Sequence, residues 1–231
     1  MITQKTSDEA LAIVDTRRDT IVKELHERHG CHTAILYGSQ ARGDANEVSD
    51  YDIIGIRQSG NPFRDARLWD GLYLDIFIYP ESTLAEPTEQ FLYLREGKIL
   101  FQKDDFGTRL LSRLEAIYRA GPKKLRKDEI EALRVWHQKA LARIRLGGIQ
   151  GNLRRAELLP ALLEHLFTTR GEWYCGFKAA FQWLNENRPE VYAAFDAALQ
   201  PSAPLASIER LVTLVDDLIC NESKPAELHR T

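Results

Sequence analysis

Cysteine is scarce in this 231-residue chain, with only Cys31, Cys175 and Cys220, which lie far apart in the sequence. An odd and widely spaced set argues against a disulfide framework or a zinc ribbon, so we expect a reducing, cytoplasmic location. The six histidines show no paired metal-ligand spacing. We interpret His32, next to Cys31, as part of a strand entry and not as a metal ligand.

Long apolar runs are also missing. No segment approaches the roughly 18 apolar residues of a membrane span, and the first residues lack the charged-then-apolar pattern of a signal peptide. With 44% hydrophobic and 28% charged residues, the chain has the balance of a globular protein. We therefore expect no membrane association.

A large excess of one charge is absent, because the net charge is only -3. Residues 1–102 carry a net charge of -6 and the remaining residues +3. The chain shows no basic stripe with interleaved aromatic residues, so we do not expect nucleic acid as a partner.

The sequence changes character near residue 102. The first part predicts one helix that ends at Gly30, four short strands and a helix near residues 88–95. Its opening residues Thr6 to Glu9 fit a capping box. The predicted strands are 33–37, 51–56, 72–79 and 98–102. From Asp104 onward the apolar spacing is almost entirely helical, and Pro160 is expected to kink or restart its helix.

The segment 38–52 combines features that suit phosphate chemistry. Gly38 and Ser39 end a strand and begin a short helical turn, where the backbone can approach a ligand closely. Free N–H groups of the turn and the Ser39 hydroxyl would form a phosphate-binding corner. Gly43 is expected to end the turn in a left-handed conformation.

Three acids follow. Asp50 and Asp52 are two apart at the start of a strand, so their side chains would share a face and repel each other without a cation between them. Asp75 interrupts an apolar strand, where burying an unpaired acid is costly. If the two strands are neighbours, the three carboxylates would bind Mg²⁺, and a pair of such ions about 3.5–4 Å apart suits phosphoryl transfer. Each feature alone is more often structural; their joint occurrence favours function.

Residues 38–52 resemble the signature of DNA-polymerase-β-like nucleotidyltransferases, G-S-x-A-R-G followed by S-D-x-D. They are particularly similar to those of the bacterial minimal and the antibiotic-modifying, kanamycin-type enzymes. The resemblance covers about 30–102 and is looser in the helical half. It implies an α+β chain, with a small mixed β-sheet nucleotidyltransferase domain, a polymerase-β-like palm, over 1–102 and an α-helical bundle over 103–231.

The resemblance implies that Gly38 and Ser39 bind the triphosphate of an NTP, with ATP as the first choice. Asp50, Asp52 and Asp75 would hold Mg²⁺, as two ions. Asp75 would also lie near the acceptor and help to deprotonate it.

The implied reaction moves a nucleoside monophosphate to an unidentified hydroxyl acceptor and releases pyrophosphate. Arg42 either pairs with a nearby acid or lines the nucleotide pocket, and we favour the pairing.

The helical half adds weaker candidates. In some relatives a carboxylate of this domain acts as the base, and Glu157, Glu164 and Glu172 are the candidates here. The segment 170–178 contains Trp, Tyr and Lys178, which would stack a base and contact a phosphate. The alternative, which we weigh slightly higher, is that the two aromatic rings seal the bundle and Lys178 is a surface charge.

Three functions follow from the resemblance. The first is nucleotidylation of a small molecule such as an aminoglycoside-like antibiotic. The second is an antitoxin-type minimal nucleotidyltransferase that modifies or binds a protein partner; the helical half has no Arg followed four to six residues later by His, so it does not look like a fused toxin. The third is a non-catalytic NTP-binding module. Relatives often dimerise so that two chains build one site, which leaves a homodimer open.

Overall fold

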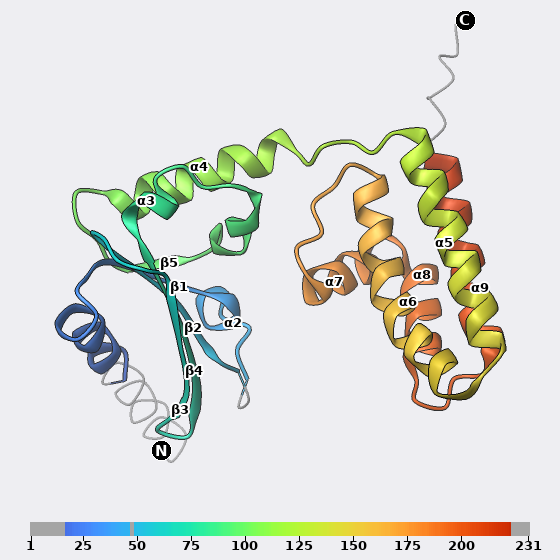
Figure 1. Ribbon diagram of the computed structural model, residues 1–231, viewed down its shortest axis with the longest axis horizontal. Helices are drawn as coiled ribbons and strands as arrows, with labels where there is room; N and C mark the ends of the chain where they lie inside the picture. Colours follow the sequence, from blue (N-terminus) through green and yellow to red (C-terminus); the bar gives the residue numbers. More distant parts are fainter. Residues whose placement is uncertain (1–16, 47–48, 223–231) are drawn as a thin grey trace, which may run out of the picture. The chain divides into compact units, whose positions relative to one another are not determined.

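The computed structural model describes residues 17–46 and 49–222. The chain divides into two compact units, unit 1 over Met1–Ala120 and unit 2 over Gly121–Thr231, and each unit is described by itself (Figure 1). The predicted α+β class is confirmed, because a mixed five-stranded sheet is accompanied by helices. The predicted capping box at Thr6 to Glu9 lies outside the described residues.

Unit 1 is built on one sheet with the strand order β3-β4-β2-β1-β5. The strands are β1 Cys31–Tyr37, β2 Tyr51–Arg57, β3 Phe63–Trp69, β4 Leu72–Pro80 and β5 Lys98–Phe101. β2 and β4 pair in parallel, whereas the other neighbours pair antiparallel. Four of these strands were predicted, and β3 was missed.

Apolar side chains cover both faces of this sheet. On one face, Ile21 and Leu25 of the helix over residues 17–27 pack against a cluster that includes Ile53 and Ile76. On the other face, Ile54 belongs to a second cluster that includes residues of the 3₁₀ helix η1, Glu89–Leu94, and the helix α4, Phe106–Ala120. The alternation of side chains along a strand thus sends neighbouring residues of β2 into two different cores.

The predicted division after residue 102 needs correction. Helix α4 packs onto the sheet of unit 1 through Phe106, Leu110 and Leu114, which belong to the same buried cluster as Ile35. The boundary therefore falls after Ala120 and not at the end of β5. Helical periodicity showed that α4 is a helix, but periodicity carries no information on which core a helix joins.

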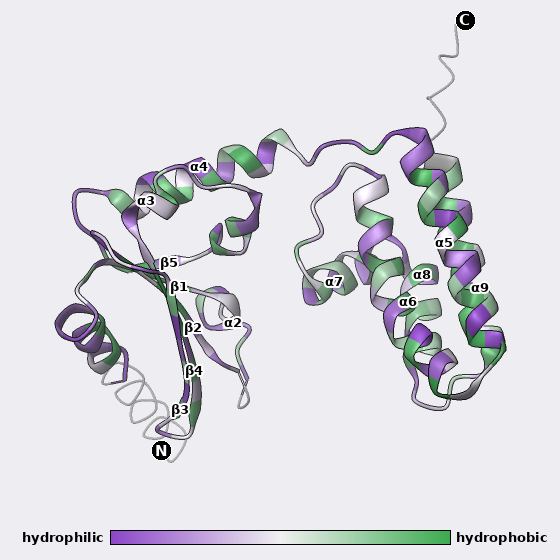
Figure 2. Cartoon of the chain, viewed as in Figure 1, coloured by the Kyte–Doolittle hydropathy of each residue, from purple (hydrophilic) through white to green (hydrophobic). Residues whose placement is uncertain are grey.

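Unit 2 is helical in the described residues. Its helices are α5 Lys127–Arg145, α6 Gly148–Thr169, α7 Phe177–Asn187, α8 Pro189–Leu199 and α9 Leu205–Glu222. Their apolar faces form one core around residues such as Leu162, Phe195 and Val212 (Figure 2). Helix α6 runs through Pro160, so of the two expected outcomes, a kink or a restart, the restart is wrong.

None of the helices in the described ranges has both the length and the apolar character that crossing a membrane requires.

A chain of polar side chains is built into the core of unit 2. His137 of α5 is fully buried, and its Nδ1 lies 2.7 Å from Oδ1 of Asp216 on α9. Its Nε2 lies 2.8 Å from Nδ1 of His165 on α6, and Gln138 donates to the other oxygen of Asp216 over 2.8 Å. The three helices are therefore linked by hydrogen bonds as well as by apolar packing. Burial, with a further effect of His137, lowers the pKa of His165 to about 4.

This depressed pKa predicts that unit 2 loses stability in weak acid. An unfolded histidine titrates near about 6.5, so between this pH and about 4 the unfolded chain binds a proton that the folded chain excludes. We expect the urea midpoint of unit 2 to fall as the pH drops through this window. The fall should be smaller in His165→Gln, which cannot titrate. An equal pH dependence in both proteins would contradict the assignment.

Candidate functional site

The first part of the site is the turn that follows β1. The short helix α2, Gly38–Arg42, begins directly after Tyr37 and ends at Gly43, which adopts the predicted left-handed conformation with φ 87°. Ser39 is buried within this turn. Gly38 also has a positive φ, 70°, and a Cβ built on it would lie 2.2 Å from Oδ2 of Asp52. A glycine is therefore required here for two reasons, the backbone conformation and the close approach of the carboxylate.

The second part is a pair of facing carboxylates. Asp52 of β2 and Asp75 of β4 are register partners in the parallel pair, so they stand on neighbouring strands at the same height and on the same face. Tyr37 of β1 faces Asp52 from the other side. The condition that the strands of Asp52 and Asp75 are neighbours is thus met.

Arg64 of β3 forms an ion pair with the carboxylate of Asp75. Its Nε and Nη2 atoms donate to the two oxygens of Asp75, each over 2.7 Å, in the bidentate geometry that suits a guanidinium. The Arg64 side chain is 57% exposed, whereas that of Asp75 is 17% exposed. Asp75 is therefore neutralised by a cation that can turn toward solvent. Arg64 was missed by the sequence reasoning because β3 itself was missed.

Tyrosine side chains border the same carboxylates. The rings of Tyr37 and Tyr93 lie 4.9 Å apart. Burial raises the pKa of Tyr37 well above its usual value, and Tyr93, Asp52 and Asp75 raise it further. The phenol therefore remains neutral and is able to donate a hydrogen bond beside the acids.

The approach to β2 is held by hydrogen bonds between Asn46 and Ser49. The backbone N–H of Asn46 donates to Oγ of Ser49 over 2.8 Å, and the Ser49 hydroxyl donates to Oδ1 of Asn46 over 3.1 Å. Asp50 follows Ser49, is exposed, and precedes the first residue of β2. Of the three predicted metal-binding acids, the structure places Asp52 and Asp75 on paired strands and Asp50 at the entry to one of them.

Arg42 forms an ion pair, as we favoured. Its Nη2 lies 3.3 Å from Oδ2 of Asp44, and both side chains are partly exposed. A nucleotide-binding role for Arg42 stays a prediction.

The remaining candidates lie in unit 2. Lys178 is exposed in the first turn of α7. Glu157 pairs with Arg154 over 2.6 Å, Glu172 pairs with Arg170 over 3.2 Å, and Glu164 is exposed. The ring of Tyr174 lies 6.2 Å from that of Phe167 and packs on the bundle core, which favours the sealing role for this residue. The roles proposed for Lys178 and the three glutamates stay predictions.

The donor set of the sheet site fits Mg²⁺. Asp52 and Asp75 offer oxygen atoms only, which is the ligand type of this hard cation. Gly38 leaves the space that the Asp52 carboxylate fills, and a side chain there would displace it. Among the described residues, however, the cluster whose possible ligand atoms lie within 4.8 Å of one another is a different one. It consists of Glu24, His29 and Asp65, elsewhere in unit 1. Arg64 would have to release an oxygen of Asp75 before this acid could bind a metal.

No protein-family model matches the sequence, and no curated protein matches it. Among solved structures, the chain is similar to a nucleotidyltransferase-like protein from Exiguobacterium sibiricum 255-15. The two share 15% sequence identity over 83% of this chain and 69% of that chain, with a TM-score of 0.37. A likeness at this level does not assign an activity to the chain.

The close approach at Gly38 predicts a difference between two glycine substitutions. Gly38→Ala and Gly43→Ala both force a side chain into positive φ, at about 1–2 kcal/mol each. Only Gly38→Ala also displaces the Asp52 carboxylate, because nothing lies within 4 Å of a Cβ at Gly43. We expect a larger loss in the free energy of unfolding for Gly38→Ala in urea denaturation. Equal losses would show that Asp52 moves away without cost.

Proposed function

We propose that the chain is a Mg²⁺-dependent nucleotidyltransferase. It would move a nucleoside monophosphate from an NTP, with ATP as the first candidate, onto a hydroxyl of a small molecule such as an aminoglycoside-like antibiotic. The observation that carries the proposal is the pair Asp52 and Asp75, at facing positions on parallel strands, with Asp52 packed against the Gly38 turn. The signature over residues 38–52 supports the same conclusion.

Different residues of unit 1 would bind the triphosphate and the metal ions. The backbone of Gly38 and the hydroxyl of Ser39 would bind the triphosphate, whose negative charge suits N–H and O–H donors. Asp50, Asp52 and Asp75 would hold Mg²⁺, which when bound would offset the charge of the phosphates. Tyr37 is placed to donate a hydrogen bond toward the carboxylates and to help fix their orientation.

The transfer step itself balances without a further reactant. The acceptor oxygen would form a bond to the α-phosphorus while the bond from that phosphorus to the bridging oxygen breaks, and pyrophosphate leaves. The proton of the acceptor hydroxyl must go to a base. Asp75 would take it from a position next to Asp52, provided that Arg64 has turned away.

One observation favours the second candidate, a module that binds NTP without catalysis. Both oxygens of Asp75 are engaged by Arg64, so the acid is satisfied without any metal. If Arg64 never releases Asp75, nucleotide binding at the Gly38 turn would persist while transfer would not occur.

The deciding experiment measures pyrophosphate release with Mg²⁺ and each of the four NTPs, against a panel of aminoglycosides and lincosamides. Asp52→Asn and Asp75→Asn should each reduce a compound-dependent signal by on the order of 100-fold or more, because a transition-state contact is lost. Asp70→Asn is the matched control. It removes an equal charge from an exposed position of the same unit, where asparagine tolerates the positive φ of 48°.

The outcomes separate the candidates. Release that depends on one compound and is lost in the aspartate variants would identify the acceptor. Silence across the panel with intact Mg²⁺-dependent NTP binding would contradict a small-molecule acceptor of these classes and favour a protein acceptor. Absence of NTP binding would contradict the proposed function as a whole.

Arg64 yields a separate prediction. Because its guanidinium competes with a metal for Asp75, Arg64→Ala should lower the Mg²⁺ concentration for half-maximal activity severalfold. Arg64→Lys keeps the charge but loses the bidentate fork, so it should fall between the two proteins. A Mg²⁺ titration of activity measures this. A higher Mg²⁺ requirement in Arg64→Ala would show that Arg64 assists the site and does not compete for it.

A further inference from the structure

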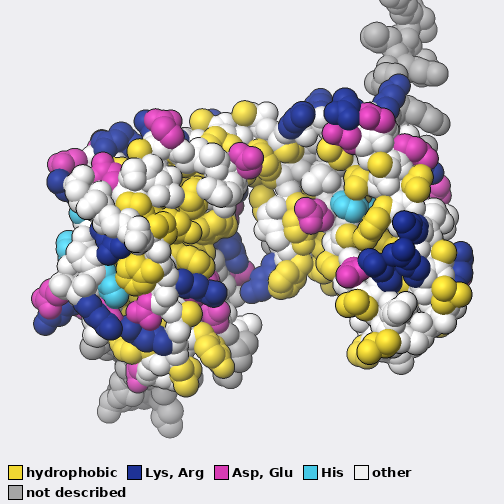
Figure 3. Space-filling view, viewed as in Figure 1, with side chains coloured by type: hydrophobic (Ala, Val, Ile, Leu, Met, Phe, Trp, Pro, Cys, Tyr) yellow, Lys and Arg dark blue, Asp and Glu magenta, His cyan; other side chains and the backbone are white. Residues whose placement is uncertain are grey.

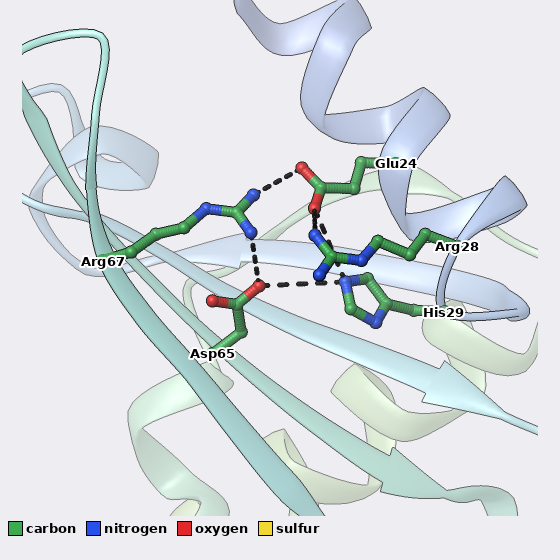
Figure 4. Close-up of polar contacts among 5 residues, drawn as sticks. All are labelled: Glu24, Arg28, His29, Asp65 and Arg67. Carbon is green, nitrogen blue, oxygen red and sulfur yellow. Dashed lines mark hydrogen bonds and ion pairs between the residues drawn. The ribbon is translucent and has the colours of Figure 1, made fainter.

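A second group of ligand-type side chains lies on the opposite face of the sheet from Asp52 and Asp75. Asp65 of β3 faces Ile76 of β4, and Ile76 belongs to the core that the helix over residues 17–27 covers. Glu24 comes from this helix, and His29 comes from the turn that follows it. Figure 4 shows the three side chains pointing toward one another across the gap between the helix end and β3.

The imidazole of His29 is the unusual member of this group. Its side chain is only 9% exposed, and its Nε2 is buried without a hydrogen-bond partner. This nitrogen lies 3.7 Å from Oε1 of Glu24 and 3.8 Å from Oδ2 of Asp65. Both distances exceed those of a hydrogen bond, and a buried polar atom without a partner is costly.

We propose that Glu24, His29 and Asp65 form a binding site for a borderline divalent metal ion such as Zn²⁺. Their three ligand atoms lie within 4.8 Å of one another. In a tetrahedral zinc site with bonds of about 2.0–2.1 Å, ligand atoms lie about 3.4 Å apart. The two distances from His29 Nε2, 3.7 and 3.8 Å, are already close to this value, and side-chain rotation of the two acids would adjust the distance between their oxygens. The imidazole nitrogen favours Zn²⁺ over Mg²⁺, which prefers oxygen ligands. Water would complete the coordination.

Two arginines contact the carboxylates and would compete with a metal ion for them, so they would affect its affinity. Nη1 of Arg28 lies 2.8 Å from Oε1 of Glu24, and Arg67 bridges Glu24 and Asp65, the latter over 2.8 Å (Figure 4). Burial raises the pKa of Glu24, but the hydrogen bonds from Arg67 and Arg28 outweigh this effect and hold it below its usual value. The carboxylate is thus ionised and ready to bind. Arg67 would remain as an outer-shell donor, whereas Arg28, which is 66% exposed, would move into solvent.

The bound ion would connect the end of the helix to β3, the edge strand of the sheet. Its role would be structural, because it lies on the opposite sheet face from the proposed transfer site. The metal site is therefore independent of nucleotidyl transfer. If the chain does not bind Zn²⁺ there, the proposed function is not affected.

The test is calorimetric titration of the tag-free full chain with Zn²⁺, and separately with Mg²⁺, for the parent and two ring-for-ring variants. His29→Phe removes the ligand nitrogen while it keeps a ring against Phe63, and it should weaken Zn²⁺ binding by about 100-fold or more. His26→Phe is the matched control, because His26 comes from the helix that carries Glu24 and stacks on Phe101 outside the group. It should leave the affinity unchanged. Arg28→Gln removes a competing cation and should tighten binding about fivefold.

The readings are distinct. One saturable Zn²⁺ per chain that is lost in His29→Phe and retained in His26→Phe supports the site. The absence of saturable binding, or an affinity that His29→Phe does not change, overturns it and leaves an ion-pair cluster only. Absorption of the Co²⁺ form adds a check, since a thiolate band that disappears in Cys175→Ser would place the metal on cysteine and would also overturn the proposal.

Discussion

The repulsion between two facing carboxylates is the constraint on which the site in unit 1 depends. Asp52 and Asp75 stand side by side on parallel strands, and two ionised acids so placed repel each other unless a cation lies between or beside them. In the structure this cation is Arg64, which takes both oxygens of Asp75. A metal ion would satisfy the same electrostatic need. The two cations are therefore alternatives for one acid, and the position of Arg64 decides which chemistry is available.

The backbone around these acids follows from the same requirement. The Asp52 carboxylate can occupy its place only because Gly38 has no side chain, and the strand–turn–strand path needs the positive φ of Gly38 and Gly43. Hydrogen bonds between Asn46 and Ser49 then hold the chain at the entry to β2, which pairs with β1. The donors proposed to bind phosphate are set beside Asp52 by the local geometry of the 38–43 turn, whereas Asp75 is brought to Asp52 by the long-range pairing of β4 with β2.

This difference explains what the sequence could predict. The turn at 38–43 and the α+β class depend on residues close together or on simple alternation. The pairing of the strands of Asp52 and Asp75 depends on residues far apart, and from the sequence it could be stated only as a condition. The sequence did not predict where unit 1 ends. Whether α4 packs on the sheet or on the helical bundle depends on the tertiary contacts of Leu110 and Leu114. The approach of His29 to Glu24 and Asp65 was equally invisible, since Asp65 lies on a distant strand and the three residues have no spacing that marks a metal site.

Strand β3 shows most clearly why a strand with several charged residues is difficult to predict from its sequence. Its sequence places charged and apolar residues on both faces, so it lacks the separation of one apolar face from one polar face that marks a half-buried strand, and it was not predicted. In the structure it is an edge strand, where charged side chains are stable and also discourage pairing with another chain. Its alternation sends Arg64 to Asp75 on one face, and on the other face it places Asp65 and Arg67, of which Arg67 pairs with Glu24. Charged side chains of both signs accordingly lie close together on the surface of unit 1 (Figure 3). One edge strand thus supplies the arginines that pair with Asp75 on one face of the sheet and with Glu24 on the other. A shift of its register by one residue would exchange the two faces and separate both carboxylates from their arginines.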